Sequence, residues 1–392
     1  METDKRKRMQ EILDGAVADG EIAGGSFCMW KDGRELCYFQ SGYADLGRKI
    51  PVERDSIFRL YSMTKPVTAA AVMKLMEDGL LDIGAPMSSV FPSFSGQVVI
   101  GKDGERIPVK REVTVRDLLD MTAGLLYPGH GGTAGKETDR LFLELDRRLL
   151  SDHPMTTEEL ADGLGHCPLA FQPGSSWQYS SCADVLGAVV ERVSGISFSE
   201  YLQEFLFGPL GMADTDFHVP EEKRGRLAVV YQDAGSGLEP YTGNHLGILN
   251  AMDRKPAFES GGAGLVSTVD DYMRFAGMLL QGGKYGTQRI LSEKTVRFLT
   301  GGGLSGNRQA EFERQFSQLA GFTYGNLMRV RRGEGMAYHL GSVGEYGWDG
   351  WLGCYFANDP QERTSLVFMT QKKAAGTLGV LRKLKNVGMS SS

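Results

Sequence analysis

One serine and one lysine stand three residues apart, at Ser62 and Lys65, and the chain contains no other Ser-x-x-Lys pair. On a helix this spacing places both side chains on one face, where the amine can reach the hydroxyl. Lysine can serve as the base for a serine nucleophile when it is buried, because burial disfavours the ammonium form. A shift of about 3 pKa units corresponds to roughly 4 kcal/mol. The pair therefore indicates nucleophilic catalysis, although the same two residues would also suit a helix cap and a solvated first-turn lysine.

The segment that follows has the pattern of a buried helix. Thr68 to Met76 carries a single charge, and a helix that is apolar on nearly every side is buried. Pro66 is tolerated only in the first turn of a helix, so we expect the helix to begin at Ser62 or the next residue. It should run to Asp78, with Gly79 as its C-terminal stop. The serine would then lie at the positive end of the helix dipole.

Two later stretches contain further residues that could take part in chemistry. Residues 172–181 read as a turn, a short extended piece and the start of a helix, with Tyr179 just before that helix. Residues 345–356 read as a glycine-punctuated strand rich in aromatic residues, and they include Trp348-Asp349-Gly350-Trp351. Glycine in a strand often marks the close approach of a ligand or another backbone.

These stretches together resemble the serine β-lactamase and penicillin-binding-protein superfamily, on its class C side. Within it, the chain is most similar to the family VIII carboxylesterases. Further segments match in family order: residues 114–125, 209–215 and 261–268. Several segments in order are far more specific than a Ser-x-x-Lys pair alone.

The resemblance implies a role for each candidate residue. Ser62 would be the acylated nucleophile, and Lys65 and Tyr179 would share the general-base and general-acid work. The backbone N–H groups of Ser62 and Trp351 would form the oxyanion hole, the latter from an edge strand after Trp348-Asp349-Gly350. Whether Lys65 or Tyr179 takes the proton of Ser62 stays open. One physical reading is that the ammonium lowers the pKa of the Tyr179 phenol, so that a tyrosinate takes the serine proton.

Departures from the β-lactamase pattern bear on the substrate. Class C enzymes end their second motif in Asn, where this chain has Ser181, and their third motif is Lys-Thr-Gly, where it has Trp348-Asp349-Gly350. Loss of that lysine removes a fixed cation for a β-lactam carboxylate. Trp348 offers an apolar wall instead, and the charge of Asp349 would further disfavour anionic substrates if it faces the site.

We therefore expect a serine carboxylesterase for short-chain acyl esters, acting through an acyl-enzyme without a metal or cofactor. A β-lactamase or a D-amino-acid peptidase is the same-class alternative. A sensor that is acylated without turnover is the alternative from another class. The chain contains no Gly-x-Ser-x-Gly, so the nucleophile elbow of α/β-hydrolases offers no competing site.

Apolar strand-like runs lie near both ends of the 392-residue chain, and mostly helical patterns lie between them. This order predicts an α/β (α+β) fold of the β-lactamase type, with one antiparallel sheet built from both termini, helices flanking it, and a helical domain. We expect the sheet domain to comprise residues 1–79 and 219–392, and the helical domain residues 80–218. The runs on either side of Asp32-Gly33 predict a β-hairpin, and residues 351–356 predict a strand.

Composition narrows the class of protein. Hydrophobic residues make up 41% and the net charge is −6, which argues against a nucleic-acid surface. No run is long enough to span a bilayer, and no apolar signal region follows the basic N-terminus, so we expect a cytoplasmic protein. Five cysteines without Cys-x-x-Cys spacing indicate reduced thiols, and six scattered histidines are expected to be structural or on the surface. The expected partner is a small-molecule ester, and we expect binding to neither nucleic acid nor a membrane. The sequence leaves open whether the protein is a monomer or a homo-oligomer.

Overall fold

The computed structural model describes residues 1–101, 103–235 and 237–390 of the chain. Its centre is an eight-stranded sheet in which all neighbouring strands are antiparallel. In spatial order the strands are β12 (Phe322–Gly325), β13 (Met328–Arg331), β14 (Tyr346–Asp349), β15 (Tyr355–Asp359), β16 (Thr364–Thr370), β1 (Gly24–Lys31), β2 (Arg34–Asp45) and β3 (Ile50–Pro51). Strands from both ends of the chain meet where β16 pairs with β1. This confirms the predicted antiparallel sheet built from both termini.

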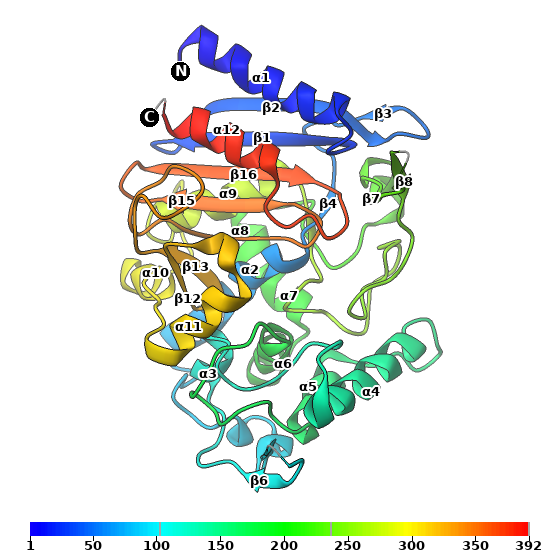
Figure 1. The fold of residues 1–392 in the computed structure, drawn as a ribbon, viewed down its shortest axis with the longest axis vertical. Coiled ribbons are helices and arrows are strands. Elements are labelled where there is room, and N and C mark those ends of the chain that lie inside the picture. The colour runs from blue at the N-terminus through cyan, green and yellow to red at the C-terminus, as the bar shows by residue number, and fades with distance from the viewer. Residues whose placement is uncertain (102, 236, 391–392) are drawn as a thin grey trace.

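Helices cover both faces of the sheet (Figure 1). The terminal helices α1 (Thr3–Ala18) and α12 (Gly379–Met389) lie together on one face, and α9 (Val269–Leu280) packs on the other. The alternation of strand side chains explains this arrangement. In β1, Phe27 and Met29 belong to the core beneath the terminal helices, whereas Cys28 belongs to the larger core on the opposite face.

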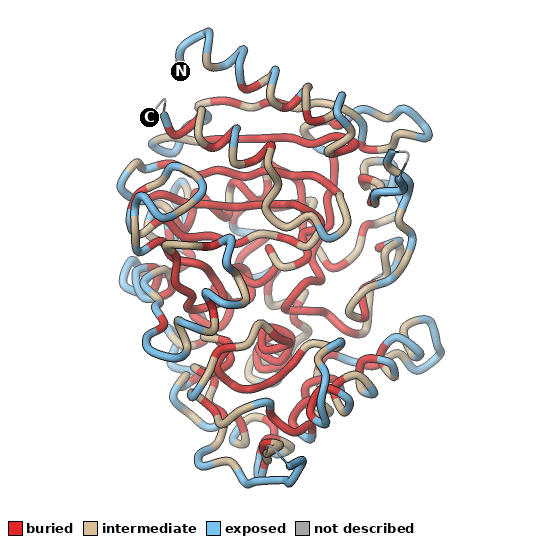
Figure 2. Tube along the Cα trace, in the orientation of Figure 1, coloured by how far each residue is buried: buried red, intermediate tan, exposed pale blue. Residues whose placement is uncertain are grey.

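The remaining helices lie mainly at the end of the molecule away from the two termini (Figure 1). They are α3 (Val115–Leu119), α4 (Gly132–Arg148), α5 (Thr157–His166), α6 (Cys182–Ser194), α7 (Phe198–Leu202) and α8 (Gly208–Leu210), with α10 (Glu293–Thr300) and α11 (Gly306–Gln315) beside the sheet. Helix α6 is buried along most of its length, as Figure 2 shows. One hydrophobic core runs from the sheet through α2 (Thr64–Glu77) into α6. The division at residues 80 and 218 therefore stays a prediction.

Four two-stranded ribbons complete the described fold. They are β4 (Phe58–Arg59) with β9 (Val266–Ser267), β5 (Val98–Ile100) with β6 (Arg106–Pro108), β7 (Tyr231–Asp233) with β8 (Leu238–Pro240), and β10 (Lys284–Tyr285) with β11 (Gln288–Arg289). The first of these matters for the site, because β4 leads directly into the segment that carries Ser62.

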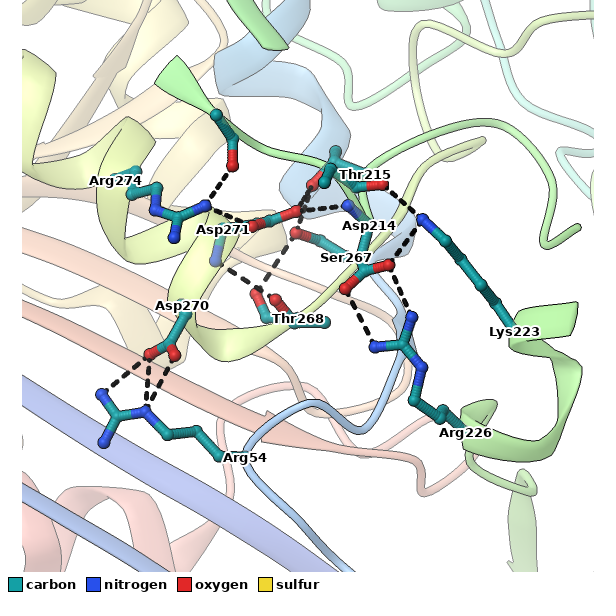
Figure 3. A network of polar contacts seen from close by, with 12 residues as sticks. Arg54, Asp214, Thr215, Lys223, Arg226, Ser267, Thr268, Asp270, Asp271 and Arg274 are labelled. Atoms are coloured by element: carbon teal, nitrogen blue, oxygen red, sulfur yellow. Dashed lines mark hydrogen bonds and ion pairs between the residues drawn. The ribbon is translucent and has the colours of Figure 1, made fainter. Parts of the chain in front are cut away.

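A polar network holds the β9–α9 junction in place (Figure 3). Thr268 caps α9, and the carboxylate of Asp271 accepts hydrogen bonds from the Asp214 amide at 2.7 Å and the Thr215 hydroxyl at 3.2 Å. The Asp214 side chain in turn pairs with Arg226, which contributes most to lowering its pKa to about 2. The network therefore links the end of the helical region to β9, the strand that pairs with β4.

Helix α4 begins earlier than the sequence predicts. The pattern indicates a helix from about residue 139, whereas α4 starts at Gly132. Its N-cap, Gly131, has no side chain to accept a hydrogen bond, and Gly132 has a φ of +78°. A helix start without a capping side chain leaves no recognisable sequence signal.

Among the described residues, no helix is long and apolar enough to cross a membrane. All five cysteines are buried and free. Within residues 1–101, 103–235 and 237–390, no three His, Cys, Asp or Glu side chains come together as metal ligands would.

Candidate active site

Ser62 lies in a short 3-10 turn, Tyr61–Met63, between β4 and α2. The turn requires a left-handed backbone at Tyr61, whose φ is +46°. Helix α2 then runs from Thr64 to Glu77 with an almost continuous buried surface, as its apolar sequence predicts. The N-cap of this helix is Met63 rather than Ser62, and Ser62 lines the cleft described below.

The Lys65 side chain is fully buried and makes three polar contacts. Its Nζ lies 3.2 Å from Ser62 Oγ, 3.2 Å from the hydroxyl of Tyr127, and 2.8 Å from the carbonyl oxygen of Gly262. Burial lowers the pKa of Lys65 to about 8, against the opposing charge of Asp184. The amine can therefore be neutral near physiological pH, as the chemistry of the serine requires.

Tyr179 lies in the extended segment before α6, and its phenol reaches the same serine. The phenolic oxygen shares a hydrogen bond with the Ser62 hydroxyl and accepts one from Trp348 Nε1 at 3.0 Å. The Lys65 Nζ lies 4.6 Å from the centre of the tyrosine ring. Burial raises the pKa of Tyr179, while the two hydrogen bonds act against that rise. The resting phenol is therefore neutral and can donate a proton.

The third motif lies at the end of β14 and in the turn that follows. The expectation of a strand over residues 351–356 is wrong at its start, because residues 350–354 turn and β15 begins only at Tyr355. The Gly350 amide donates to the Cys354 carbonyl at 2.7 Å, and Gly353 has a φ of +91°. Left-handed backbone of this kind favours glycine. Gly350 and Gly353 thus lie in a tight turn, whereas Gly347 lies in β14, where a Cβ would be 2.0 Å from the Phe356 carbonyl oxygen.

Gly350 also marks a close approach of two chain segments. A Cβ at this position would lie 2.3 Å from the carbonyl oxygen of Leu60, two residues before the nucleophile. The third motif can therefore lie against the Ser62 segment only with glycine here. Strand β14 is interior rather than an edge strand, since β13 and β15 flank it. Trp348 and Asp349 nevertheless extend past β13 and pair only with β15, which leaves their other side open.

The amides of Ser62 and Trp351 are available as oxyanion donors. In the described part of the chain, neither donates to a backbone carbonyl. Both residues line one cleft of about 910 Å³ that opens to solvent, together with Tyr179, Trp348 and Asp349. All the residues predicted for the site thus lie in or directly beneath this cleft.

The Asp349 carboxylate has a positively charged neighbour. Arg329, which is fully buried, lies 3.5 Å from the carboxylate, and burial raises the pKa of Asp349 against the effect of that guanidinium. No lysine or arginine is found among the described residues that line the cleft. The third motif therefore presents an indole and a neutralised carboxylate where a cation would bind an anionic substrate.

Three further residues belong to the site and were not singled out from the sequence. Tyr127 contacts Lys65, and its hydroxyl donates to Asp184 Oδ2 at 3.4 Å. Asp184 is buried and also accepts from the amide of Gly262 at 3.0 Å. His245 lines the cleft and stacks on Trp351, with ring centres 4.2 Å apart. The sequence gives no signal that would place this histidine in the cleft wall.

Comparison with known proteins identifies the family. The β-lactamase family model matches residues 9–384, so the chain belongs to the β-lactamase family. Esterase EstB of Burkholderia gladioli is 34% identical over 279 residues, 68% of each chain. Protein Rv1367c of Mycobacterium tuberculosis is 29% identical over 371 residues, 93% of this chain and 88% of that protein. The structure of EstCE1, described as a hydrolase with promiscuous acyltransferase activity, superposes with a TM-score of 0.82 at 29% identity and covers 98% of both chains.

The fold and these relatives define a family VIII esterase within the serine β-lactamase and penicillin-binding-protein superfamily. The protein is accordingly a serine hydrolase.

Proposed function

We propose that the protein is a carboxylesterase that hydrolyses short-chain acyl esters through an acyl-enzyme on Ser62. The observation that carries this proposal is that one hydroxyl contacts both the buried amine of Lys65 and the phenol of Tyr179, a half-buried residue that lines the cleft. A neutral ester suits the cleft, because no cation among its described lining residues would bind a carboxylate. EstB and EstCE1 are named as an esterase and a hydrolase, which supports this choice.

The contacts of Lys65 favour the amine as the base for the first step. A neutral amine has two N–H donors and one lone pair. The carbonyl of Gly262 and the hydroxyl oxygen of Tyr127 can accept the two N–H bonds, which leaves the lone pair for the proton of Ser62. Ser62 Oγ then attacks the ester carbonyl, and the amides of Ser62 and Trp351 stabilise the oxyanion.

Tyr179 completes acylation as a general acid. It gives its proton to the departing alkoxide, so the alcohol leaves and a tyrosinate remains beside the Lys65 ammonium. The N–H of Trp348 and that ammonium stabilise the tyrosinate. In deacylation the tyrosinate takes a proton from water, the resulting hydroxide attacks the acyl carbon, and the Ser62 oxygen leaves with the proton of Lys65. Every group then returns to its starting protonation state.

The test measures p-nitrophenyl esters of increasing acyl length beside a chromogenic cephalosporin and a D-alanyl peptide. We expect turnover of the acetyl and butyryl esters, loss of that turnover by roughly a thousandfold or more in Ser62→Ala, and a transient acyl adduct on Ser62 in mass spectrometry. Ester hydrolysis that survives in Ser62→Ala would contradict the proposal. Faster turnover of the cephalosporin or the peptide would favour the β-lactamase or peptidase alternative, and an adduct that persists for hours would favour an acylated sensor.

A second candidate is transfer of the acyl group to an alcohol in place of water. The aromatic lining of the cleft favours it, because the half-buried rings of Phe316 and Trp351 offer apolar surface to an acceptor alcohol. EstCE1 is described as having such activity. Formation of benzyl acetate from vinyl acetate and benzyl alcohol in water, absent in Ser62→Ala, would establish it. Acetic acid as the sole product would exclude it.

A further inference from the structure

The two tryptophans of the third motif each anchor one aromatic wall of the cleft. Trp348 contacts Tyr179 and Phe316, with ring centres 5.6 and 5.8 Å apart, and we call these three residues the Trp348 wall. Trp351 contacts Tyr61 at 4.9 Å and stacks on His245 at 4.2 Å, and we call these three the Trp351 wall. All six line the same cleft as Ser62.

The positions of the proton donor and the oxyanion donors assign a substrate group to each wall, given the function proposed above. The leaving alcohol must lie near Tyr179, because this phenol protonates it, so the alcohol faces the Trp348 wall. The oxyanion points to the amides of Ser62 and Trp351. In a tetrahedral intermediate the acyl chain takes the remaining direction, away from Tyr179. It therefore lies against the Trp351 wall.

A tight turn fixes the position of His245 in that wall. His245 and Ile248 exchange backbone hydrogen bonds at 3.3 and 3.1 Å around a left-handed Leu246 (φ +55°) and Gly247 (φ +72°). A Cβ at Gly247 would lie 2.4 Å from the Leu145 side chain, so the turn packs tightly on α4. Leu246 holds a left-handed conformation that is unfavourable for a residue other than glycine. The imidazole is therefore presented to the cleft by a constrained segment.

The Trp351 wall contains polar groups that the protein does not use. In the described parts of the chain, no protein group forms a hydrogen bond with either ring nitrogen of His245. The hydroxyl of Tyr61 also has no hydrogen-bond partner there. Neither residue is among those with fully enclosed unpaired polar atoms, and the half-buried His245 lines the cleft. Burial lowers the pKa of His245, with Lys373 acting in the same direction, so the ring is neutral at pH 7. A neutral imidazole offers one donor and one acceptor.

We propose that the Trp351 wall is the acyl subsite and that His245 selects acyl groups with a neutral hydrogen-bonding substituent, such as a hydroxyl on the third carbon. An alkyl chain packed against the imidazole would shield its ring nitrogens from solvent and leave a polar group unpaired. A hydroxyl at the same place can pair with either ring nitrogen while the chain packs on the indole. The substrate class is thus short hydroxyacyl or similarly substituted acyl esters.

The experiment compares two p-nitrophenyl esters of equal shape, 3-hydroxybutyrate and 3-methylbutanoate, which differ by a hydroxyl against a methyl. The quantity measured is the ratio of their kcat/KM values in wild type and in each variant, so that intrinsic reactivity cancels. We expect His245→Phe, which keeps an aromatic ring on Trp351, to lower the ratio by about 3- to 10-fold, the equivalent of one neutral hydrogen bond. His245→Asn, which keeps a donor and an acceptor, should retain a larger ratio than His245→Phe.

Tyr241→Phe is the matched control. Tyr241 packs behind Trp351 with ring centres 5.9 Å apart, and its hydroxyl contacts the Asn244 carbonyl at 3.5 Å, outside the cleft lining. Its ratio should equal that of wild type. A ratio unchanged in both His245 variants would overturn the assignment even if Ser62-dependent hydrolysis is intact. Hydrolysis of both esters that persists in Ser62→Ala would instead overturn the proposed function itself.

Discussion

The indole Nε1 of Trp348 donates a hydrogen bond to the phenolic oxygen of Tyr179 at 3.0 Å. The relationship joins the second and third motifs, and it places a fixed donor on the group that is proposed to become a phenolate. The bond works against the rise in the pKa of Tyr179 that burial causes. Replacement of the lysine of the third motif by tryptophan thus exchanges a substrate-binding cation for a donor aimed at the acid-base tyrosine.

Trp348→Phe should keep an aromatic ring in the Trp348 wall and remove this donor. Because hydrogen bonds to charged groups contribute about 1.5–3 kcal/mol, we expect kcat on an activated acetyl ester to fall roughly 10- to 100-fold. Trp30→Phe is the matched control, since the Trp30 indole nitrogen is buried without a partner among the described residues. Equal activities in the two variants would show that the bond to Tyr179 has no catalytic effect.

The activity should depend on pH through Lys65. Burial lowers the lysine pKa to about 8, and the proposed first step needs the neutral amine. The value of kcat/KM should therefore rise with pH, reach half its maximum near pH 8, and level off above. A pH profile with a stable substrate such as ethyl acetate measures this. Activity that falls as pH rises through 8 would mean that the ammonium form is required and that a tyrosinate is the base.

Local sequence signals sufficed for those parts of the fold that depend on neighbouring residues. The hairpin at Asp32-Gly33 forms as predicted, with φ of +54° and +73°, values that a two-residue hairpin turn requires. Helix α2 ends at Glu77, with Asp78 as its cap and Gly79 in the left-handed region, within one residue of the expected end. Both features are encoded within a few residues of sequence.

Contacts between distant segments were not predictable in the same way. The stack of His245 on Trp351 joins residues far apart in the chain, and nothing beside a lone histidine indicates its partner. The sequence of the Trp351 segment fits a strand as well as a turn, because glycines occur both in strands that ligands approach and in tight turns. Only the packing of Gly350 on Leu60 and the positive φ of Gly353 distinguish the two cases.

A stability prediction concerns the start of β14. Glu345, which is fully buried just before that strand, pairs with the buried amine of Lys385 on α12 and lies 3.5 Å from Arg331. Lys385→Met preserves the side-chain volume but leaves Glu345 with one weaker partner, so we expect a loss of about 2–4 kcal/mol in the free energy of unfolding. Urea unfolding at pH 7 measures it.

The matched control for this stability change is Lys7→Met. Lys7 is 78% exposed and lies 3.9 Å from Glu11, and its replacement should cost less than about 0.5 kcal/mol. A loss in Lys385→Met no greater than in the control would show that the buried pair does not hold α12 to the third motif.

Asp184 should set the pH range in which Lys65 is neutral. Its buried carboxylate raises the pKa of Lys65, in opposition to burial. Asp184→Asn keeps an oxygen for the amide of Gly262 but removes the charge, so the lysine pKa should fall further and the rise of kcat/KM with pH should move to lower pH.

The matched control is Asp271→Asn. It removes another buried carboxylate, one that is not among the groups acting on the Lys65 pKa, so the rise of kcat/KM should stay near pH 8. If the rise of kcat/KM in Asp184→Asn stays near pH 8 or moves to higher pH, the Asp184 carboxylate does not control the pKa of Lys65. Because a merely structural role would lower activity without moving the profile, the direction of the shift separates the two roles.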